Sequence, residues 1–198
     1  MKLCFATNNK HKLEEAKDIA RDYFTIVSLD EINCFEELPE TSPTLEGNSL
    51  QKADYVFRKY NVPCFADDTG LEVESLNGEP GVYSARYAGE HKSSEDNIDL
   101  LLNKLLPHEN RRARFRTVIT LLGLAPAPLY FDGIVPGVIT PGRKGTSGFG
   151  YDPIFIPDGY RKTYAEMSLR EKSSLSHRAM ALRKLEEYLK NRATAHSK

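Results

Sequence analysis

The sequence lacks several features that would assign it to a protein class at once. Its 198 residues contain no tryptophan and only three cysteines, Cys4, Cys34 and Cys64, none of which forms a C-x-x-C pair. A zinc cluster or a thioredoxin-type redox site therefore has no support. No apolar run approaches the ~20 residues that a membrane span requires, and the short apolar start at 1–6 is no signal peptide. These absences predict a soluble globular protein.

A charge excess of one sign is missing too. The chain has 27 Lys and Arg residues against 28 Asp and Glu residues, which gives a formal net charge of −1. Proteins that bind along DNA or RNA usually carry a basic face. The balance argues against a nucleic-acid polymer as partner, but it leaves small phosphorylated ligands open.

The length and the cysteines indicate how the chain is stabilised. At roughly 100–200 residues per domain, residues 1–198 are expected to form one domain, and a chain of this size buries about 70% of its unfolded surface without needing disulfides. Cys4 and Cys64 fall in apolar, strand-like runs. We expect buried, reduced thiols and hence a cytoplasmic location.

Strand and helix patterns alternate from the N-terminus and predict an α/β fold. We expect a strand at 2–6, a helix from Lys10 to about Asp22, a strand at 24–29, and a long polar loop over 30–47. A helix through Leu50 and Tyr60 should then lead into a strand at 64–66 and another at 71–74.

The second half of the sequence predicts a mixed sheet. A helix over 93–106 precedes two β-rich runs, 112–122 and 129–139, which we expect to pair as antiparallel neighbours. A last helix is predicted over 174–192.

The first strand-to-helix turn, TNNKHK at 7–12, is a candidate anion site. It has neither the glycines of a P-loop nor those of a dinucleotide fingerprint. A helix N-terminus nevertheless offers N–H groups and the positive end of the helix dipole. Thr7 adds a hydroxyl and Lys12 a charge. The alternative is that Asn9 only caps the helix and that the lysines are solvated.

Two consecutive carboxylates, Asp67 and Asp68, follow the strand at 64–66. Neighbouring residues of a strand point to opposite faces, so both can line one pocket only if the strand has ended there. A carboxylate at such a position can hold Mg²⁺ or accept a proton from water. The alternative is an Asx-turn leading into Gly70.

Two further segments carry groups that suit a nucleotide base. SGFGYDP at 147–153 places aromatic rings and a carboxylate among glycines, which could sandwich a flat base. Lys172, His177 and Arg178 gather donors near a helix start, and Lys52 lies off the apolar stripe of its own helix. The alternatives are an ordinary turn and a solvated helix start. Taken together, the segments supply what a nucleoside triphosphate site needs.

Five strings in order resemble the inosine triphosphate pyrophosphatase family, which hydrolyses deaminated purine nucleoside triphosphates. They are ATNNKHK at 6–12, ADDTGLEV at 66–73, PGVYSARYAG at 80–89, GFGYDP at 148–153 and SHR at 176–178. The resemblance covers the chain from Met1 to about Leu189.

The resemblance implies a role for each matching residue. Asp68 would be the proton acceptor and a Mg²⁺ ligand, with Glu40 as the second metal residue and nearby Glu46 as its competitor. The triphosphate and base contacts would be Thr7, Asn8, Asn9, Lys10, His11, Lys12, Lys52, Thr69, Phe149, Gly150, Tyr151, Asp152, Lys172, His177 and Arg178. Thr69 stands where bacterial members commonly have serine, which keeps the hydroxyl.

The family also implies a fold and an activity. The fold is a long mixed β-sheet flanked by helices, with two lobes and the active site in the cleft. The activity is Mg²⁺-dependent hydrolysis of ITP, dITP and XTP to the monophosphate and pyrophosphate, which keeps these nucleotides out of DNA and RNA. Homodimers are usual in the family. Two alternatives stay open: a Maf-like pyrophosphatase for pyrimidine or other modified nucleotides, and a non-enzymatic nucleotide-binding module.

Overall fold

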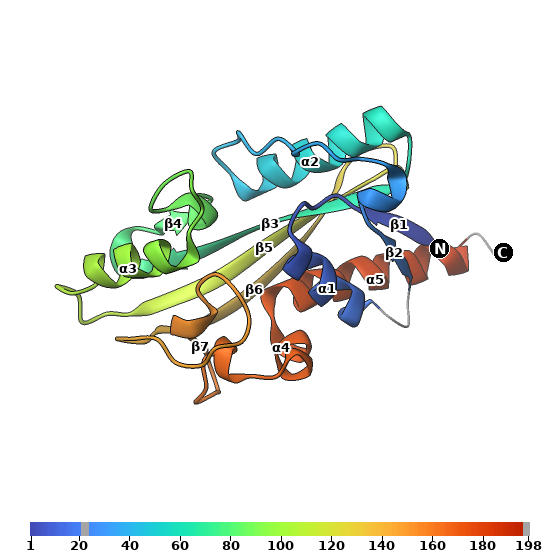
Figure 1. Ribbon diagram of the computed structural model, residues 1–198. Coiled ribbons are helices and arrows are strands. Elements are labelled where there is room, and N and C mark those ends of the chain that lie inside the picture. Colours follow the sequence, from blue (N-terminus) through green and yellow to red (C-terminus); the bar gives the residue numbers. More distant parts are fainter. Residues whose placement is uncertain (21–23, 196–198) are drawn as a thin grey trace. The chain divides into compact units, whose positions relative to one another are not determined.

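The computed structural model describes residues 1–20 and 24–195 (Figure 1). Its strands are β1 (Lys2–Phe5), β2 (Thr25–Val27), β3 (Cys64–Val73), β4 (Pro80–Gly81), β5 (Arg112–Leu122), β6 (Leu129–Ile139) and β7 (Phe155–Pro157). Its α-helices are α1 (Lys10–Ile19), α2 (Leu45–Tyr60), α3 (Ser94–Lys104), α4 (Leu169–Leu175) and α5 (His177–Ala195). Short 3₁₀ turns are η1 (Asp30–Ile32), η2 (Glu74–Leu76), η3 (Ser84–Arg86), η4 (Asp152–Ile154) and η5 (Tyr164–Glu166).

The strands form one mixed sheet in the order β2-β1-β3-β5-β6-β7, with β4 paired to β3. β1 runs parallel to both neighbours, with Lys2 opposite Thr25 and Cys4 opposite Cys64. β4 runs antiparallel to β3, and β7 runs antiparallel to β6. The predicted α/β class with a mixed sheet is therefore confirmed.

The chain divides into two compact units, each built from separated segments. The first unit holds residues 1–68, 117–133 and 177–198, and the second holds 69–116 and 134–176. Three strands, β3, β5 and β6, continue from one unit into the other. The boundary in β3 falls directly after Asp68.

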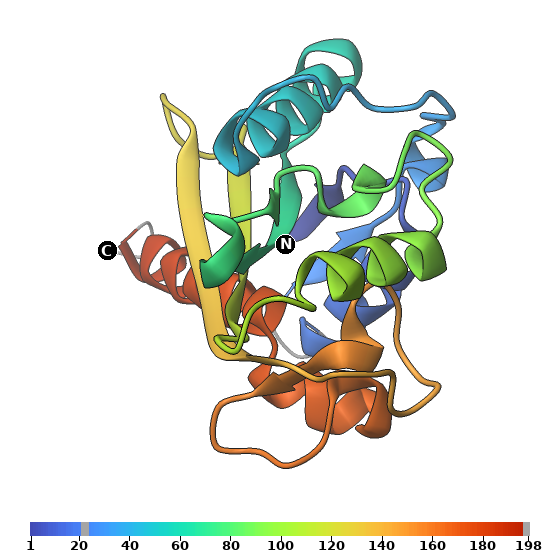
Figure 2. The same cartoon turned by 90° about the vertical axis from the view of Figure 1, so that its left-hand side faces the viewer.

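The first unit has a layered core (Figures 1 and 2). Cys64 and Ala66 of β3 pack with Ala53 and Val56 of α2 on one face of the sheet. Phe65 belongs to the cluster on the other face, which includes residues of α1, its C-cap and α5: Ala16, Ala20, Ala181, Leu182 and Leu185. Because side chains alternate along a strand, each residue of β3 is committed to one of these two faces.

The second unit has its own apolar core. Ile98 and Leu101 of α3 and its C-cap residue Leu105 join Phe115 and Phe155 in one buried cluster. The two aromatic rings meet edge to face, with their centroids 4.7 Å apart. This core supports the segment around Tyr151, which belongs to the same cluster.

Several predicted element bounds need correction. β3 is one continuous strand through Asp67 and Asp68, so neither a strand end nor an Asx-turn occurs there. The predicted last helix is two helices, because Ser176 is extended (φ −69°, ψ 155°) and separates α4 from α5. α2 begins at Leu45, capped by Thr44, inside the segment predicted as loop. The predicted end of the first helix at Asp22 lies outside the described residues.

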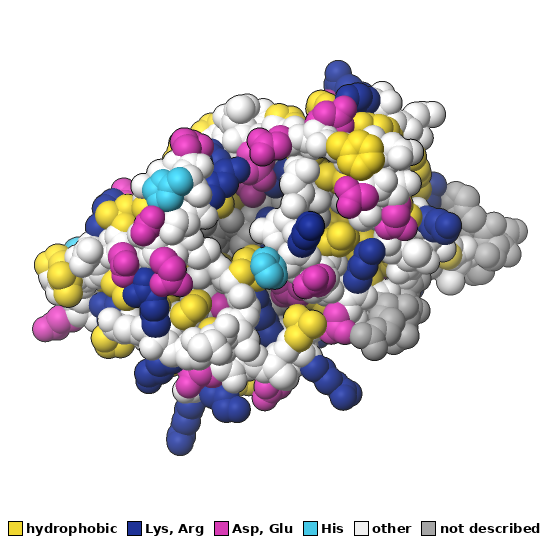
Figure 3. All heavy atoms as spheres, in the orientation of Figure 1, with side chains coloured by type: hydrophobic (Ala, Val, Ile, Leu, Met, Phe, Trp, Pro, Cys, Tyr) yellow, Lys and Arg dark blue, Asp and Glu magenta, His cyan; other side chains and the backbone are white. Residues whose placement is uncertain are grey.

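The surface carries charge of both signs. On the face drawn in Figure 3, acidic and basic side chains are interspersed. Within residues 1–20 and 24–195, no helix is both long enough and apolar enough to cross a membrane.

Candidate active site

The loop after β1 is folded by its own side chains. The Thr7 hydroxyl accepts a hydrogen bond from the Asn9 N–H (3.2 Å), and Asn9 Oδ1 accepts one from the Lys12 N–H (3.1 Å). Asn9 is thus the N-cap of α1, as one of the two interpretations of this turn required. Lys10 and His11 are exposed in the first turn. The loop therefore presents a capped helix N-terminus with basic side chains, which suits an anion.

Asn8 has a different part in this loop. Its side-chain amide donates to the Glu36 carbonyl (3.1 Å), and its Oδ1 accepts from the Leu38 N–H (3.1 Å). The amide thereby attaches the loop after β1 to the segment that leads to Glu40. Sequence reasoning gave Asn8 only a phosphate contact.

The two consecutive aspartates of β3 face different partners. Asp67 lies on the face with α1 and α5, where it accepts from Lys12 Nζ at 3.1 Å and from Arg178 Nε at 3.0 Å. Asp68 lies on the face with α2, where Asn48 Nδ2 donates to it at 3.1 Å and Lys52 Nζ approaches to 3.5 Å. The continuous strand thus separates the two carboxylates by alternation.

Lys52 brings Glu40 and Asp68 together. Its ammonium lies 2.5 Å from Glu40 Oε1 and 3.5 Å from Asp68 Oδ1. The Lys52 side chain is only 5% exposed, whereas Glu40 keeps 31% of its side chain exposed. The competing Glu46 lies in the first turn of α2. We call Glu40, Lys52 and Asp68 the carboxylate–lysine cluster.

Burial and charge shift the pKa of Asp68 and Asp67 in opposite directions. For Asp68, burial raises the pKa and outweighs the opposing charges of Lys52 and Lys12. For Asp67, burial also acts to raise the pKa, but the charges of Lys12 and Arg178 outweigh it and hold the pKa well below its usual range. Asp67 is thus fixed as a carboxylate, whereas Asp68 is a stronger proton acceptor than an ordinary aspartate.

The two lysines are shifted in opposite directions as well. Burial lowers the pKa of Lys12 despite the nearby Asp67 carboxylate. Burial also acts to lower the pKa of Lys52, but the charges of Asp68 and Glu40 outweigh it and raise the pKa above the usual value. Lys52 therefore stays a cation between its two carboxylates.

The oxygen donors of the cluster fit a magnesium ion. Mg²⁺ prefers oxygen ligands and is commonly held by one or two carboxylates together with substrate phosphates. Asp68 and Glu40 supply two carboxylates that already share one cation. Among the described residues, no group of three or more His, Cys, Asp or Glu could hold a metal ion. The residues therefore allow a Mg²⁺ site in which two carboxylates bind the ion and substrate phosphates complete its coordination.

Arg178 opens α5 with a side chain that is only 1% exposed. It donates to Glu15 Oε2 at 2.6 Å and to Asp67 Oδ2 at 2.9 and 3.0 Å. Next to it, the buried His177 ring places Nδ1 2.6 Å from the Thr117 hydroxyl. Both residues were predicted to hold a base. The structure places the Arg178 guanidinium on two carboxylates of the first unit.

The second unit holds the remaining predicted base residues. Asp152 Oδ2 accepts hydrogen bonds from the Phe149 N–H (2.9 Å) and from Lys172 Nζ (2.7 Å). The Lys172 ammonium also lies 4.6 Å from the centre of the Phe149 ring. Gly148 has a φ of +80°, and a Cβ there would overlap the Asp152 carboxylate, so the turn requires glycine. Phe149, Asp152 and Lys172 thus form one group of contacting residues.

Tyr151 and Thr69 are placed differently from that group. Tyr151 is buried in the core of the second unit, and its hydroxyl donates to the Ser84 carbonyl at 2.9 Å. Phe149 is then the half-buried aromatic ring of the segment, beside Gly150. Thr69 is half-buried in β3 and directly follows Asp68.

Sequence and structure comparisons assign the chain to a family. A sequence model described as the Ham1 family matches residues 3–188. The chain belongs to the Ham1 family. Among similar proteins, the dITP/XTP pyrophosphatase of Flavobacterium johnsoniae is 53% identical over 189 residues, which is 96% of this chain and 98% of the relative. That of Porphyromonas gingivalis is 50% identical over 190 residues, covering 95% and 97%.

Solved Ham1 structures confirm the predicted fold. The Ham1 protein of Staphylococcus aureus matches with a TM-score of 0.86 at 41% identity, covering 97% of this chain and 100% of that chain. A HAM1 protein from Coxiella burnetii matches with a TM-score of 0.87 at 34% identity, covering 96% and 99%.

Sequence reasoning missed two polar residues of this Ham1 chain. Glu15 and Asn48 are each 1% exposed and contact Arg178 and Asp68 respectively. Both lie in helices, where single polar residues are normally assigned to the solvated face. Their positions carry a signal of burial: Glu15 directly precedes the buried Ala16, and Asn48 lies one helical turn before Lys52 on the same side of α2.

Proposed function

We propose that this Ham1 family protein is a Mg²⁺-dependent hydrolase that cleaves ITP, dITP and XTP to the nucleoside monophosphate and pyrophosphate. The observation that carries the proposal is the carboxylate–lysine cluster, in which Lys52 joins Glu40 to Asp68. The family match and the dITP/XTP pyrophosphatase relatives support the same reaction class. In a cell, the reaction would keep deaminated purine nucleotides out of DNA and RNA.

The first unit supplies groups for the triphosphate. Lys12 pairs with Asp67, and the buried Lys52 lies next to Asp68. The loop over residues 7–12 adds the N-terminus of α1, whose first turn contains no acidic residue. We assign the phosphate contacts to Thr7, Asn8, Asn9, Lys10, His11, Lys12 and Lys52, with Thr69 as a further substrate contact.

Asp68 would act as the proton acceptor. A water oxygen forms a bond to the α-phosphorus, the bond from that phosphorus to the oxygen bridging to the β-phosphorus breaks, and Asp68 takes the proton from the water. Lys12 and Lys52 neutralise charge on the departing pyrophosphate. Asp68 and Glu40 would hold Mg²⁺, which supplies orientation and charge neutralisation at the phosphates when bound.

The base contacts would discriminate by hydrogen bonding. We assign them to Phe149, Gly150, Tyr151, Asp152, Lys172, His177 and Arg178. Hypoxanthine and xanthine carry an O6 acceptor, whereas adenine carries an N–H₂ donor at that position. A donor aimed at O6 would leave a buried adenine donor unpaired, which costs about 1–3 kcal/mol. The residues that contact the nucleobase would therefore favour ITP over ATP.

A pyrophosphate-release assay tests the proposal. ITP and XTP should release pyrophosphate in the presence of Mg²⁺ and not after its chelation, with kcat/KM for ITP at least roughly 10-fold above that for ATP. Equal kcat/KM values for ITP and ATP would sink the base assignment. Preference for a pyrimidine triphosphate would favour the Maf-like alternative. Binding of ITP without release would favour a non-enzymatic module.

Two properties complete the proposal. We place the protein in the cytoplasm, because its three cysteines are unpaired and buried, as expected in a reducing compartment. We also propose a homodimer, which light scattering after size-exclusion chromatography would test against the mass of 22.3 kDa for one chain.

A further inference from the structure

The segment that carries Glu40 depends on side chains from other elements. Residues 36–42 lie outside the helices and strands, between η1 and α2. Asn8 holds the start of the segment through the backbone of Glu36 and Leu38. Gln51 of α2 holds its end, accepting from the Thr41 N–H and donating to the Thr41 hydroxyl, both at 2.9 Å.

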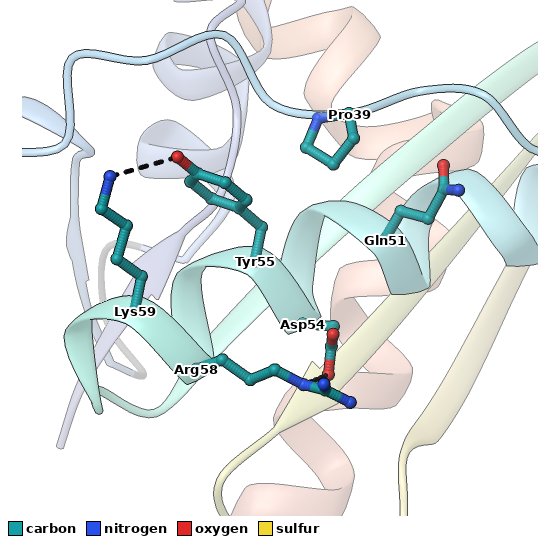
Figure 4. A pocket seen from close by; sticks show the side chains of 6 residues that line it. All are labelled: Pro39, Gln51, Asp54, Tyr55, Arg58 and Lys59. Atoms are coloured by element: carbon teal, nitrogen blue, oxygen red, sulfur yellow. Dashed lines mark hydrogen bonds and ion pairs between the residues drawn. The ribbon is translucent and has the colours of Figure 1, made fainter.

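An open groove borders part of this segment. Pro39 lies across α2 above an open groove of about 380 Å³, and the Gln51 amide reaches from α2 toward the segment (Figure 4). The groove is lined by Pro39, Gln51, Asp54, Tyr55, Arg58 and Lys59. Leu38, next to Pro39, packs into the buried core of the first unit, so packing and hydrogen bonds together hold the segment that carries Glu40.

Asn48 holds the segment and Asp68 at once. Its Oδ1 accepts from the Ser42 N–H at 2.8 Å, and its Nδ2 donates to Asp68 Oδ2 at 3.1 Å. The residue is 1% exposed, on the buried side of α2, one turn before Lys52. Because both ends of one planar amide are engaged, its orientation is fixed.

We propose that Asn48 is a positioning residue that sets the separation of the Glu40 and Asp68 carboxylates. This inference rests on the proposed function, in which these two carboxylates hold the metal. One rigid amide spans from the backbone two residues after Glu40 to Asp68 itself. Lys52 supplies charge to the same pair, but its ammonium is a point charge on a flexible stem. The amide therefore provides the direction that the lysine lacks.

The residue type agrees with this role. An aspartate at position 48 would lose the donor to Asp68, and a leucine would lose both hydrogen bonds. Groups that hydrogen-bond to metal ligands and orient them typically contribute 10–100-fold to metal affinity or activity. Gln51 provides a matched comparison, because it lies three residues further along α2 and also makes two hydrogen bonds, but both go to Thr41.

The test compares Asn48→Ala with Gln51→Ala. Mn²⁺, as a stand-in for Mg²⁺, is titrated into the ligand-free protein and the free ion is counted by electron paramagnetic resonance. Pyrophosphate release from ITP gives kcat and KM separately, and a thermal melt checks that each variant is folded. We expect Asn48→Ala to weaken Mn²⁺ binding roughly 10–100-fold and to lower kcat with little change in KM. Gln51→Ala should stay within about 3-fold of the parent protein, well below that range.

The outcomes separate this inference from the proposed function. Wild-type Mn²⁺ affinity in a folded Asn48→Ala variant would overturn the inference. Equal weakening in both variants would also overturn it, because the role would then be confined to holding the segment. A parent protein that releases no pyrophosphate from ITP would instead refute the proposed function.

Discussion

At the scale of single residues, two neighbouring aspartates have opposite properties because they lie on one continuous strand. Asp67 is held ionised by Lys12 and Arg178, and Asp68 has a raised pKa beside Lys52 and Asn48. The identity of the two side chains gives no hint of this difference. It follows from which face of β3 each one meets, and therefore from the helices that cover that face.

Replacing Asp68 by asparagine tests its role as proton acceptor. The amide keeps the shape of the side chain but cannot take a proton from water, so kcat should fall by about 10²–10⁴-fold while the fold is kept. Pyrophosphate release and circular dichroism measure the two effects. Asp54→Asn is a suitable control, because Asp54 pairs with the exposed Arg58 and its loss should leave the rate unchanged. Near wild-type turnover by Asp68→Asn would refute the role.

Replacing Arg178 by methionine should destabilise the protein strongly. The change leaves Glu15 and Asp67 buried without their shared cation, and breaking a buried ion pair in this way costs about 3–5 kcal/mol. The free energy of unfolding in urea measures the effect. Arg58→Met, at an exposed ion pair, should cost no more than about 1 kcal/mol. Equal losses in the two variants would contradict the assignment of Arg178 to a buried network.

At the scale of elements, α5 approaches β6 closely at Gly133. A Cβ at this position would overlap the His177 carbonyl oxygen and lie 2.7 Å from the Ala181 nitrogen. Both neighbours are backbone atoms of the first two turns of α5, so no flexible side chain can give way. Gly133 therefore sets how near the helix that carries His177 and Arg178 can come.

Replacing Gly133 by alanine should push α5 away from β6. Overpacking of this kind typically costs about 1–3 kcal/mol, and the shift should also lower kcat/KM for ITP because it moves His177. Thermal unfolding and pyrophosphate release measure the two effects. Gly142→Ala is the control, because a Cβ at Gly142 meets nothing within 4 Å. An unchanged melting temperature for Gly133→Ala would show that α5 tolerates the extra carbon.

The elements that could be predicted from sequence are those with long, continuous runs of residues that favour one type of secondary structure. The β-rich runs 112–122 and 129–139 have the bounds of β5 and β6. β3 was divided in error because Asp67 and Asp68 interrupt its apolar pattern, although buried cations make them compatible with a strand. The break at Ser176 was missed because serines are common near a helix start, and the sequence does not show that this one is extended.

The candidate site could be predicted only in part, for a related reason. The motif residues Lys12, Lys52 and Asp68 do lie together in the first unit. Asn48 and Glu15 went unnoticed, because a polar residue in a helix is assigned to solvent unless its buried partner is known. Those partners, Asp68 and Arg178, lie 20 and 163 residues away along the chain.

At the scale of the whole molecule, Glu186 makes stability depend on pH. Its side chain on α5 is buried, and its Oε1 has no hydrogen-bond partner among the described residues. Burial raises its pKa to about 7, against the charges of Lys190 and Arg183. Between pH 4.5 and 7 the unfolded chain loses this proton and the folded chain keeps it. The contribution of Glu186 to stability therefore falls as pH rises through this range and changes little above it.

Replacing Glu186 by glutamine should remove this dependence. The amide carries no charge, so the variant should be more stable than the parent at pH 8, by roughly 1–3 kcal/mol, and equal to it near pH 4. Urea unfolding across that pH range measures the difference. Glu187→Gln, at an exposed neighbouring position, is the control and should leave the pH dependence intact. A constant offset between parent and Glu186→Gln at all pH values would contradict the prediction.

The ion pairs of Arg178 also bear on how the protein is made. They join it to Glu15 and Asp67, which precede it by 163 and 111 residues. Contacts so distant in sequence form late and slow folding, because a long loop must close before they stabilise anything. During synthesis, Glu15 and Asp67 leave the ribosome long before their cation exists. The first unit can therefore be completed only when nearly the whole chain has been translated, and a chain that stops before α5 would lack the guanidinium that Glu15 and Asp67 share.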